Sequence, residues 1–164
     1  MLTFTQRVSI VMDTTSPFWH RIALTDMTPE QWESVCDGCG LCCLHKLENE
    51  EDNEIYYTDV ACRLLDTQHC RCTQYPERTR HVPGCLVLTP ATLANRLRWL
   101  PATCAYKRLA QHQPLPSWHP LISGNVDSVH QADISVRGRC VSEHEIALAD
   151  LEERVVYWVD GFGE

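Results

Sequence analysis

Apolar residues at helical spacing indicate an amphipathic helix near the end of the chain. Four of them share one helical face: Leu148, Leu151, Val155 and Trp158. Ser142 and Glu145 precede this stripe and have the spacing of a capping box, in which two side chains satisfy the first free amides of a helix. The pattern therefore predicts a helix that begins at Ser142 and runs to about Val159.

A capping residue followed by proline marks three further helix starts: Ser16-Pro17, Thr28-Pro29 and Thr89-Pro90. At the second of these, Thr28 and Gln31 form another capping box, and Met27 and Trp32 occupy the positions of a hydrophobic staple. The sequence predicts a helix over 29–35, which leads directly into a cysteine-rich run.

Other patterns predict shorter elements. They are a strand over Glu54–Asp59, a helix from Pro90 that ends before Pro101, a helix over Cys104–Gln111, an extended segment over Gln113–Ser123 and a strand over Asp133–Arg137. No internal repeat or linker separates them. We expect one small α+β domain over residues 15–164 with much irregular chain, stabilised by a cysteine-bound metal site, and a flexible extension over residues 1–14.

Charge excludes several partners. The chain has 14 Lys and Arg against 22 Asp and Glu, a formal net charge of −8. Nucleic-acid backbones and anionic membranes both require clustered positive charge, so neither is an expected partner. The longest apolar run is too short to span a bilayer. Residues 1–12 lack the apolar core of a secretory signal, and we expect a cytosolic protein.

Ten cysteines in 164 residues call for an explanation that suits this compartment. In a reducing cytosol such a density favours metal or redox chemistry over disulfides. The strongest pattern is the run Cys36-x2-Cys39-x2-Cys42-Cys43. Two residues between cysteines allow a turn to bring both sulfurs to one ion, and Gly38 and Gly40 permit the backbone conformations that such turns need. The adjacent side chains of Cys42 and Cys43 diverge, so the pair either serves two metals or divides into one ligand and one packing residue.

The remaining ligands must come from further along the chain. The predicted ligand set is Cys36, Cys39, Cys42, Cys43, Cys62, Cys72, Cys85 and Cys104. These eight thiols suffice for two four-cysteine sites, a multinuclear cluster or one site with spare thiols. Cys70 is either a ligand or a buried apolar residue, and Cys140 is predicted not to ligate. Asp37 and Asp59 are considered as oxygen ligands to iron, and His45 as a ligand or a surface histidine.

Spacing does not separate zinc from iron. The run lacks the Cys-Pro continuation of bacterial ferredoxins, which bind iron–sulfur clusters, and the chain has no second Cys-x2-Cys half of a common zinc site. Zinc, iron and an iron–sulfur cluster all remain candidate cofactors.

The residues resemble a known family. The string Cys36-Asp37-Gly38-Cys39-Gly40-Leu41-Cys42-Cys43-Leu44-His45-Lys46 is similar to the signature of the CxxCxxCC zinc- or iron-chelating family, in its YcgN-like branch. The similarity continues through Ala61-Cys62-Arg63, Cys70-Arg71-Cys72, Tyr75, Cys85, Trp99–Tyr106, Pro116–Leu121 and Ile134–Val136, and covers roughly residues 17 to 160. The resemblance implies metal chelation by cysteines and no particular activity. It assigns no role to Cys140 or to the first dozen residues.

Three functions follow as hypotheses. The first is cytosolic metal chelation for storage, delivery or structural support. The second is an iron or iron–sulfur enzyme or electron carrier, because no other catalytic motif is present. The third is a zinc-stapled module that binds a protein partner. Because few core-forming residues are expected between Leu44 and Cys85, loss of the metal should unfold much of the domain.

Overall fold

The structure is a computed structural model that describes residues 15–159 of the 164-residue chain. Helices and strands combine in a small α+β fold, as the sequence predicts. The predicted extension over residues 1–14 lies outside the described residues. Within them, no helix is long and apolar enough to cross a membrane.

All of the helices are short. The α-helices are α1 (Phe18–Arg21), α2 (Pro29–Ser34), α3 (Arg78–His81), α4 (Leu93–Arg96), α5 (Ala105–Ala110), α6 (Pro120–Ser123) and α7 (Ser128–Gln131). Turns of 3₁₀ helix occupy Leu24–Asp26, Leu41–Cys43, Tyr75–Glu77, Leu97–Trp99, Glu143–Glu145 and Leu148–Arg154. Such short helices depend on tertiary packing for their stability.

The strands form two small sheets. They are β1 (Leu44–Glu48), β2 (Ile55–Ala61), β3 (Leu65–Asp66), β4 (Arg71–Cys72), β5 (Val141–Ser142) and β6 (Val155–Val156). The longest strand, β2, pairs antiparallel with β1, and it also pairs in parallel with β5 and antiparallel with β6. The antiparallel pair β3–β4 forms the second sheet.

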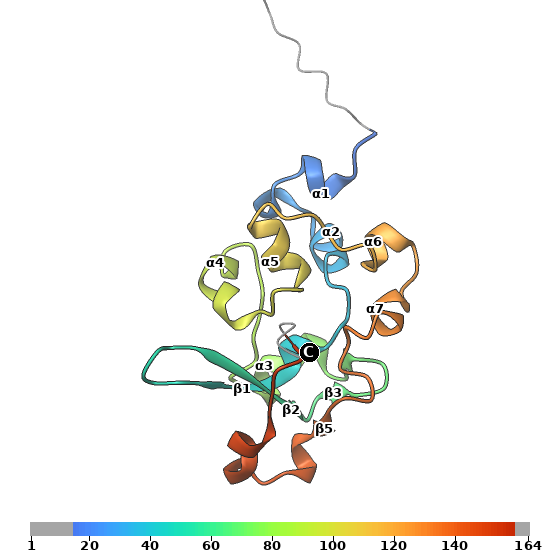
Figure 1. The fold of residues 1–164 in the computed structure, drawn as a ribbon. Helices are drawn as coiled ribbons and strands as arrows, with labels where there is room; N and C mark the ends of the chain where they lie inside the picture. The colour runs from blue at the N-terminus through green and yellow to red at the C-terminus, as the bar shows by residue number, and fades with distance from the viewer. Residues whose placement is uncertain (1–14, 160–164) are drawn as a thin grey trace, which may run out of the picture.

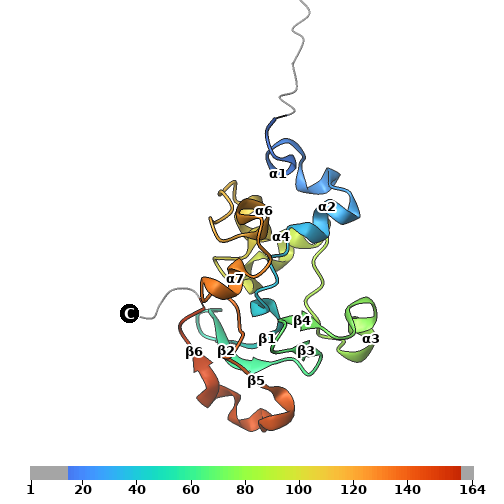
Figure 2. The same cartoon turned by 90° about the vertical axis from the view of Figure 1, so that its right-hand side faces the viewer.

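The two kinds of element occupy different halves of the molecule. In both views, helices α1, α2, α4, α5 and α6 lie together, and the strands lie at the other side (Figures 1 and 2). The chain passes from α2 through the cysteine run into β1, so residues 36–43 connect the two halves. The metal-binding motif predicted from the sequence is therefore at the junction of the fold.

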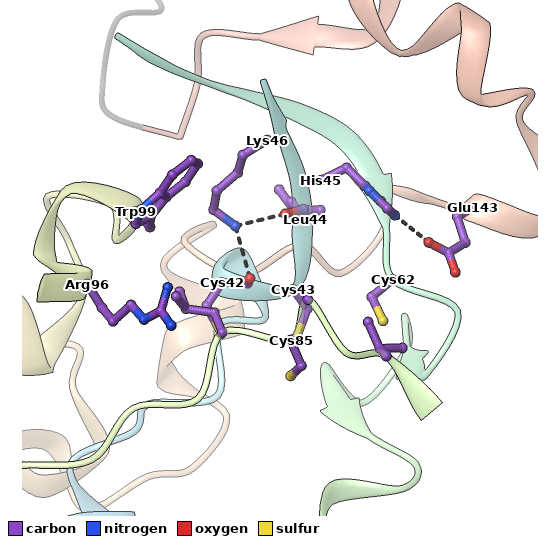
Figure 3. Close-up of a pocket in the computed structure, with 13 residues that line it drawn as sticks. Cys42, Cys43, Leu44, His45, Lys46, Cys62, Cys85, Arg96, Trp99 and Glu143 are labelled. Carbon is purple, nitrogen blue, oxygen red and sulfur yellow. Dashed lines mark hydrogen bonds and ion pairs between the residues drawn. The ribbon is translucent and has the colours of Figure 1, made fainter. Parts of the chain in front are cut away.

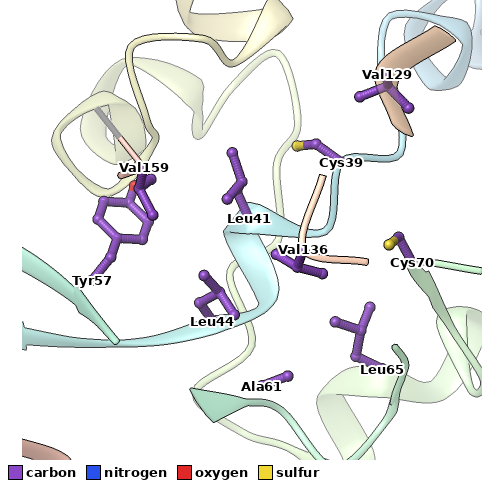
Figure 4. Close-up of a cluster of buried hydrophobic side chains, with 10 residues drawn as sticks. All are labelled: Cys39, Leu41, Leu44, Tyr57, Ala61, Leu65, Cys70, Val129, Val136 and Val159. Carbon is purple, nitrogen blue, oxygen red and sulfur yellow. The ribbon is translucent and has the colours of Figure 1, made fainter. Parts of the chain in front are cut away.

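Each half has its own buried cluster. In the helical half Trp32 packs against Tyr106 with ring centroids 4.6 Å apart, and the Tyr106 hydroxyl donates to the Trp32 carbonyl at 2.8 Å. The other cluster surrounds the cysteine run and contains Leu41, Val136 and Cys39 (Figure 4). Burial of each such large apolar side chain stabilises the fold by about 1.5–3 kcal/mol.

Several predicted elements agree with the structure. The capping box of Thr28 and Gln31 is formed and begins α2 at Pro29. Helix α5 matches the predicted helix over Cys104–Gln111, and β2 contains most of the predicted strand over Glu54–Asp59. The helix expected from Pro90 begins later, at Leu93, because the hydroxyls of Thr89 and Thr92 each accept a hydrogen bond from the other residue's amide.

The long C-terminal helix is a wrong prediction. The capping box of Ser142 and Glu145 forms, but it opens only a single 3₁₀ turn. After a second 3₁₀ helix, Val155–Val156 pairs with β2 as strand β6. Arg154 donates to both carboxylate oxygens of Asp59, at 2.8 and 2.5 Å, which fixes this segment on β2. Pairing of the β-branched valines with an open strand edge therefore prevails over the helical pattern.

Two further predictions need correction. Residues 133–137 form no strand, because Asp133 has a left-handed φ of 55° that interrupts extended backbone. The segment predicted as extended over Gln113–Ser123 ends in helix α6, for which the His119 side chain accepts a hydrogen bond from the Leu121 amide.

The segment from Leu44 to Cys85 contributes more core than its sequence suggests. Leu44, Tyr57, Val60, Ala61 and Leu65 are all buried. The expectation of few core-forming residues holds for residues 45–56 and 71–92, neither of which contains a buried apolar side chain in the described structure.

Candidate metal centre

The cysteine run is held at both ends by buried apolar residues. Val35 at the end of α2 is fully buried, and Leu41 begins the 3₁₀ turn that leads into β1. Between them, the Cys39 amide donates to Asp37 Oδ1 at 2.9 Å, and the Cys39 carbonyl accepts from the Val136 amide at 2.9 Å. These contacts fix the backbone that carries the first three thiols.

Four cysteines line one cavity of about 360 Å³. Cys42 and Cys43 come from the cysteine run, Cys62 follows β2, and Cys85 lies in the irregular segment after α3. Figure 3 shows these residues, from three separate stretches of chain, around the same space. The structure thus brings together predicted ligands from the cysteine run and from further along the chain.

Three other members of the predicted set, Cys36, Cys39 and Cys104, do not line the cavity. The charge of Cys42 contributes to raising the pKa values of Cys36, Cys39 and Cys104, so these thiols are electrostatic neighbours. Cys42 and Cys104 also pack against the same buried cluster of the helical half. Cys42 therefore lines the cavity and also influences the ionisation of these three thiols.

Although Cys42 and Cys43 are adjacent in the chain, their side chains pack against different parts of the fold. Cys43 packs against the cluster around the strands, whereas Cys42 packs against the helical cluster. Their thiols still interact: a hydrogen bond from the Cys43 thiol lowers the pKa of Cys42, and the same contact raises that of Cys43. The charge of Lys46 favours the Cys42 thiolate further.

Lys46 places a positive charge beside the cysteines. Its ammonium group donates to the carbonyls of Cys42 and Leu44 at 2.9 and 2.8 Å (Figure 3) and lies 4.9 Å from the centroid of the Tyr57 ring. Desolvation lowers the pKa of Lys46, and the charges of Cys42, Cys43, Cys39 and Cys85 oppose that shift. Among residues 15–159 it forms no ion pair with a carboxylate. When the neighbouring cysteines ionise, their thiolates are thus the anions nearest to this cation.

Most of the thiols are protonated at neutral pH in the metal-free protein. Desolvation, followed by the charges of Asp37 and Cys42, raises the pKa of Cys36. Desolvation also raises the pKa of Cys104 to about 12 and raises those of Cys62 and Cys85. A cysteine binds a metal ion as a thiolate, so a metal ion that binds these cysteines would displace their protons.

The other cysteines fall outside the cavity lining. Cys72 on β4 lies near the cavity set, because its charge contributes to the raised pKa values of Cys62 and Cys85. Cys70 is buried in the cluster around the strands, and Cys140 packs against that cluster, with the charge of Cys70 raising its pKa. Cys70 shares this cluster with the predicted ligand Cys39, and neither Cys70 nor Cys140 lines the cavity.

Two candidates for ligation have other partners. Both oxygens of Asp59 are bound by Arg154. His45 lines the cavity but pairs through Nε2 with Glu143 (Figure 3). Arg63 also contacts Glu143, at 3.1 Å. Desolvation works against ionisation of Glu143, yet the hydrogen bonds from His45 and Arg63 outweigh it and lower its pKa.

The thiols are near one another without being arranged around a point. Among residues 15–159, no group of three or more His, Cys, Asp or Glu side chains is placed to hold a metal ion as it stands. A metal ion bound by the cavity set would therefore require rotation of cysteine side chains.

Three residues of the site were not singled out from the sequence. Lys46 and Glu143 line the cavity, and the Arg71 guanidinium lies against Gly38 inside the cysteine run. Lys46 carried a usable signal, because it is a lone lysine at the start of a strand directly after the cysteines. Glu143 and Arg71 reach the site only through tertiary contacts.

Fold and site together define a cysteine-rich α+β protein built around a CxxCxxCC motif. Residues 35–105 match the CxxCxxCC domain, described as a "Putative zinc- or iron-chelating domain". A UPF0260 protein of Marinobacter nauticus is 54% identical over 87% of this chain and 96% of its own length. A UPF0260 protein of Gluconacetobacter diazotrophicus is 54% identical over 90% of each chain. No solved structure matches the chain.

The chain belongs to the UPF0260 family of proteins with a CxxCxxCC domain. Its domain description supports metal binding in general terms.

Proposed function

We propose that the protein is a cytosolic zinc- or iron-chelating protein whose metal is held by the thiolates of the CxxCxxCC run together with downstream cysteines. The observation that carries this proposal is the convergence of Cys42, Cys43, Cys62 and Cys85 on one cavity. Sulfur ligands of this number suit zinc and iron, which bind thiolates at about 2.3 Å in tetrahedral sites.

The charges around the cavity support the same conclusion. Four thiolates around a divalent ion leave two negative charges. Lys46 lies beside the thiols without a carboxylate partner, and Arg96 lines the same cavity. Positive side chains at this position stabilise an anionic metal–thiolate centre. The acidic residue of the cavity lining, Glu143, already pairs with His45 and Arg63.

A bound ion would supply a cross-link between parts of the chain that share little other packing. Residues 71–92 contain no buried apolar side chain, and Cys85 is the thiol among the four residues that they contribute to the cavity lining, with Val82, Gly84 and Leu86. Structural zinc contributes about 10–16 kcal/mol of apparent binding free energy, which couples to folding. Chelation and the ordering of this segment are then one process.

The test is metal analysis of protein purified without oxygen. We expect zinc or iron in near-stoichiometric amount, and absence of both metals with all thiols freely reactive would overturn the proposal. The absorption spectrum assigns the metal, because zinc thiolates are colourless and iron–sulfur clusters absorb in the visible range. Cell fractionation tests the cytosolic location.

A pair of variants localises the metal. Cys85→Ser removes a cavity ligand and should lower the metal content, whereas Cys140→Ser replaces a half-buried cysteine outside the cavity and should leave it unchanged. Equal metal content in both variants would contradict the assignment of the cavity as the site.

A further inference from the structure

The cavity of the candidate metal centre is larger than a metal ion needs. Its volume is about 360 Å³. Thiolates hold zinc at about 2.3 Å, so an ion accounts for little of this space. Binding sites for small molecules begin at about 300 Å³. The cavity therefore has room for a small molecule beside the cysteines.

The side chains of the lining divide into two groups. Figure 3 shows Lys46, Arg96 and Trp99 at one end of the cavity. Cys62 and Glu143 lie at the opposite end. Lys46 belongs to β1, Arg96 to α4, and Trp99 to the 3₁₀ turn that follows α4. The end formed by these three residues is termed the cationic end.

Arg96 supplies a guanidinium group whose hydrogen-bond donors are unused. Within residues 15–159 it forms no ion pair and donates no hydrogen bond. Its neighbour Arg98, by contrast, donates to Glu48 at 2.7 Å. Arg96 is also exposed, so the cationic end is open to solvent. Its guanidinium group can therefore receive a ligand without breaking a contact of the fold.

Lys46 adds a second positive charge with one donor to spare. An ammonium group has three N–H bonds, and two of these donate to the carbonyls of Cys42 and Leu44. The acidic residue of the lining, Glu143, lies at the other end and pairs with His45. In the described part of the chain, no carboxylate of the lining thus balances the two cations at this end.

The chemistry of the cationic end favours an anion with a carbon skeleton. A guanidinium group binds a carboxylate through two parallel hydrogen bonds, and an ammonium group adds a point charge. The half-buried Trp99 ring and Leu86 line the same cavity and offer apolar surface for carbon atoms. Lys46 is bonded to the cysteine run and would share its charge with a metal centre, whereas Arg96 is not.

We propose that the cationic end of the cavity binds a small organic carboxylate, with Arg96 as its main anchor, Lys46 as a second donor and Trp99 as an apolar wall. The inference goes beyond the proposed function, because none of these three residues is a proposed metal ligand. The carboxylate is a second occupant of the cavity, beside the thiols.

Isothermal titration calorimetry of the full-length protein as purified tests the proposal. The probes are succinate, tricarballylate and benzoate, three carboxylates that chelate metal ions weakly. Dimethyl succinate is the neutral control, and inorganic phosphate distinguishes an organic carboxylate from any oxyanion. We expect saturable binding of at least one carboxylate, which weakens as salt screens the charges, and no binding of the ester.

Arg96→Gln is the decisive variant. It removes no hydrogen bond or ion pair of the described residues, so the melting temperature should be unchanged. Carboxylate affinity should fall about tenfold, because charged hydrogen bonds to the ligand are lost. Arg80→Gln removes the same charge from an exposed residue outside the cavity lining and should bind like the wild type. Lys46→Gln should also weaken binding, and Lys46→Arg should restore it.

The outcomes are distinct. Absence of saturable binding for all three carboxylates overturns the inference, and so does equal affinity in the wild type and Arg96→Gln. An equal loss in Arg96→Gln and Arg80→Gln would reflect net charge alone and also overturns it. Phosphate that binds as tightly as the best carboxylate overturns the assignment to an organic acid. Metal analysis of the same samples tests the proposed function separately, so either proposal can fail while the other stands.

Discussion

The guanidinium group of Arg71 lies directly against the backbone of Gly38, so that a Cβ atom on that glycine would be 2.7 Å from Arg71 Cζ. Two glycines of the cysteine run share a positive φ of 77°, and both are enclosed. They differ in what encloses them. Gly38 faces the guanidinium end of a long, exposed arginine side chain, which can move aside. At Gly40, a Cβ atom would be 2.8 Å from the side chain of Val136, which is fully buried.

We therefore expect Gly40→Ala to destabilise the protein more than Gly38→Ala. Both variants incur about 1–2 kcal/mol for left-handed backbone. Only Gly40→Ala forces a stiff, buried neighbour to shift, which adds about 1–3 kcal/mol of overpacking. Urea unfolding of the two metal-free variants measures the difference in free energy of unfolding. Equal losses would show that Val136 yields as easily as Arg71.

Lys46→Met should weaken metal binding at the cavity by about tenfold, equivalent to about 1.4 kcal/mol. The variant keeps the length of the side chain and removes the ammonium group next to Cys42. Lys46→Arg restores the positive charge and is the matched control, with affinity close to the wild type. Competition with a coloured zinc chelator gives the affinities. A similar loss in both variants would mean that Lys46 acts through packing alone.

Removal of the metal should loosen residues 71–92 before the rest of the molecule. This segment has no buried apolar side chain, while the neighbouring hairpin of β1 and β2 buries Leu44, Tyr57, Val60 and Ala61. After chelation we expect amide exchange at least tenfold faster in 71–92, with protection kept in β2. Hydrogen exchange read by mass spectrometry checks this. Unchanged protection in 71–92 would show that the metal does not order the segment.

The Cys140 thiol should react slowly with iodoacetamide at neutral pH. Desolvation, with added repulsion from Cys70 and Asp59, raises its pKa to about 11. A raised pKa favours the unreactive protonated thiol, so the alkylation rate should climb about tenfold per pH unit above pH 7 and level off near pH 11. Mass spectrometry of the peptide that contains Cys140 follows the rate, with urea-unfolded protein as the reference. A plateau near pH 8.5 would contradict the raised pKa.

The sequence predicted best where local rules decide the structure. The capping box of Thr28 and Gln31 forms as expected, because side chain and backbone partners lie within one turn. The equivalent box at Ser142 also forms, yet the helix stops after one turn, since the edge of β2 offers Val155 and Val156 backbone partners that the sequence alone cannot reveal.

The candidate site likewise combines features that the local sequence predicts with features that only tertiary contacts create. The set predicted from the sequence included Cys42, Cys43, Cys62 and Cys85, and the fold places these four around one cavity, whereas Cys36 and Cys39 of the same run do not line it. The charged surroundings could not be predicted, because Arg71 and Glu143 reach the cysteines through chain reversals far from the motif. Asp37 lies inside the motif, but only its burial distinguishes it from a surface carboxylate.

The position of β5 and β6 has a consequence for how the protein is made. Both strands come from the last 24 residues of the chain, and both pair with β2, which is translated much earlier. While the ribosome is still adding the end of the chain, every proposed metal ligand has already been translated, but Tyr57–Ala61 still lacks its final partners. An open strand edge of this kind can pair with another chain. A nascent or truncated protein would thus hold every proposed metal ligand before its sheet is closed to association.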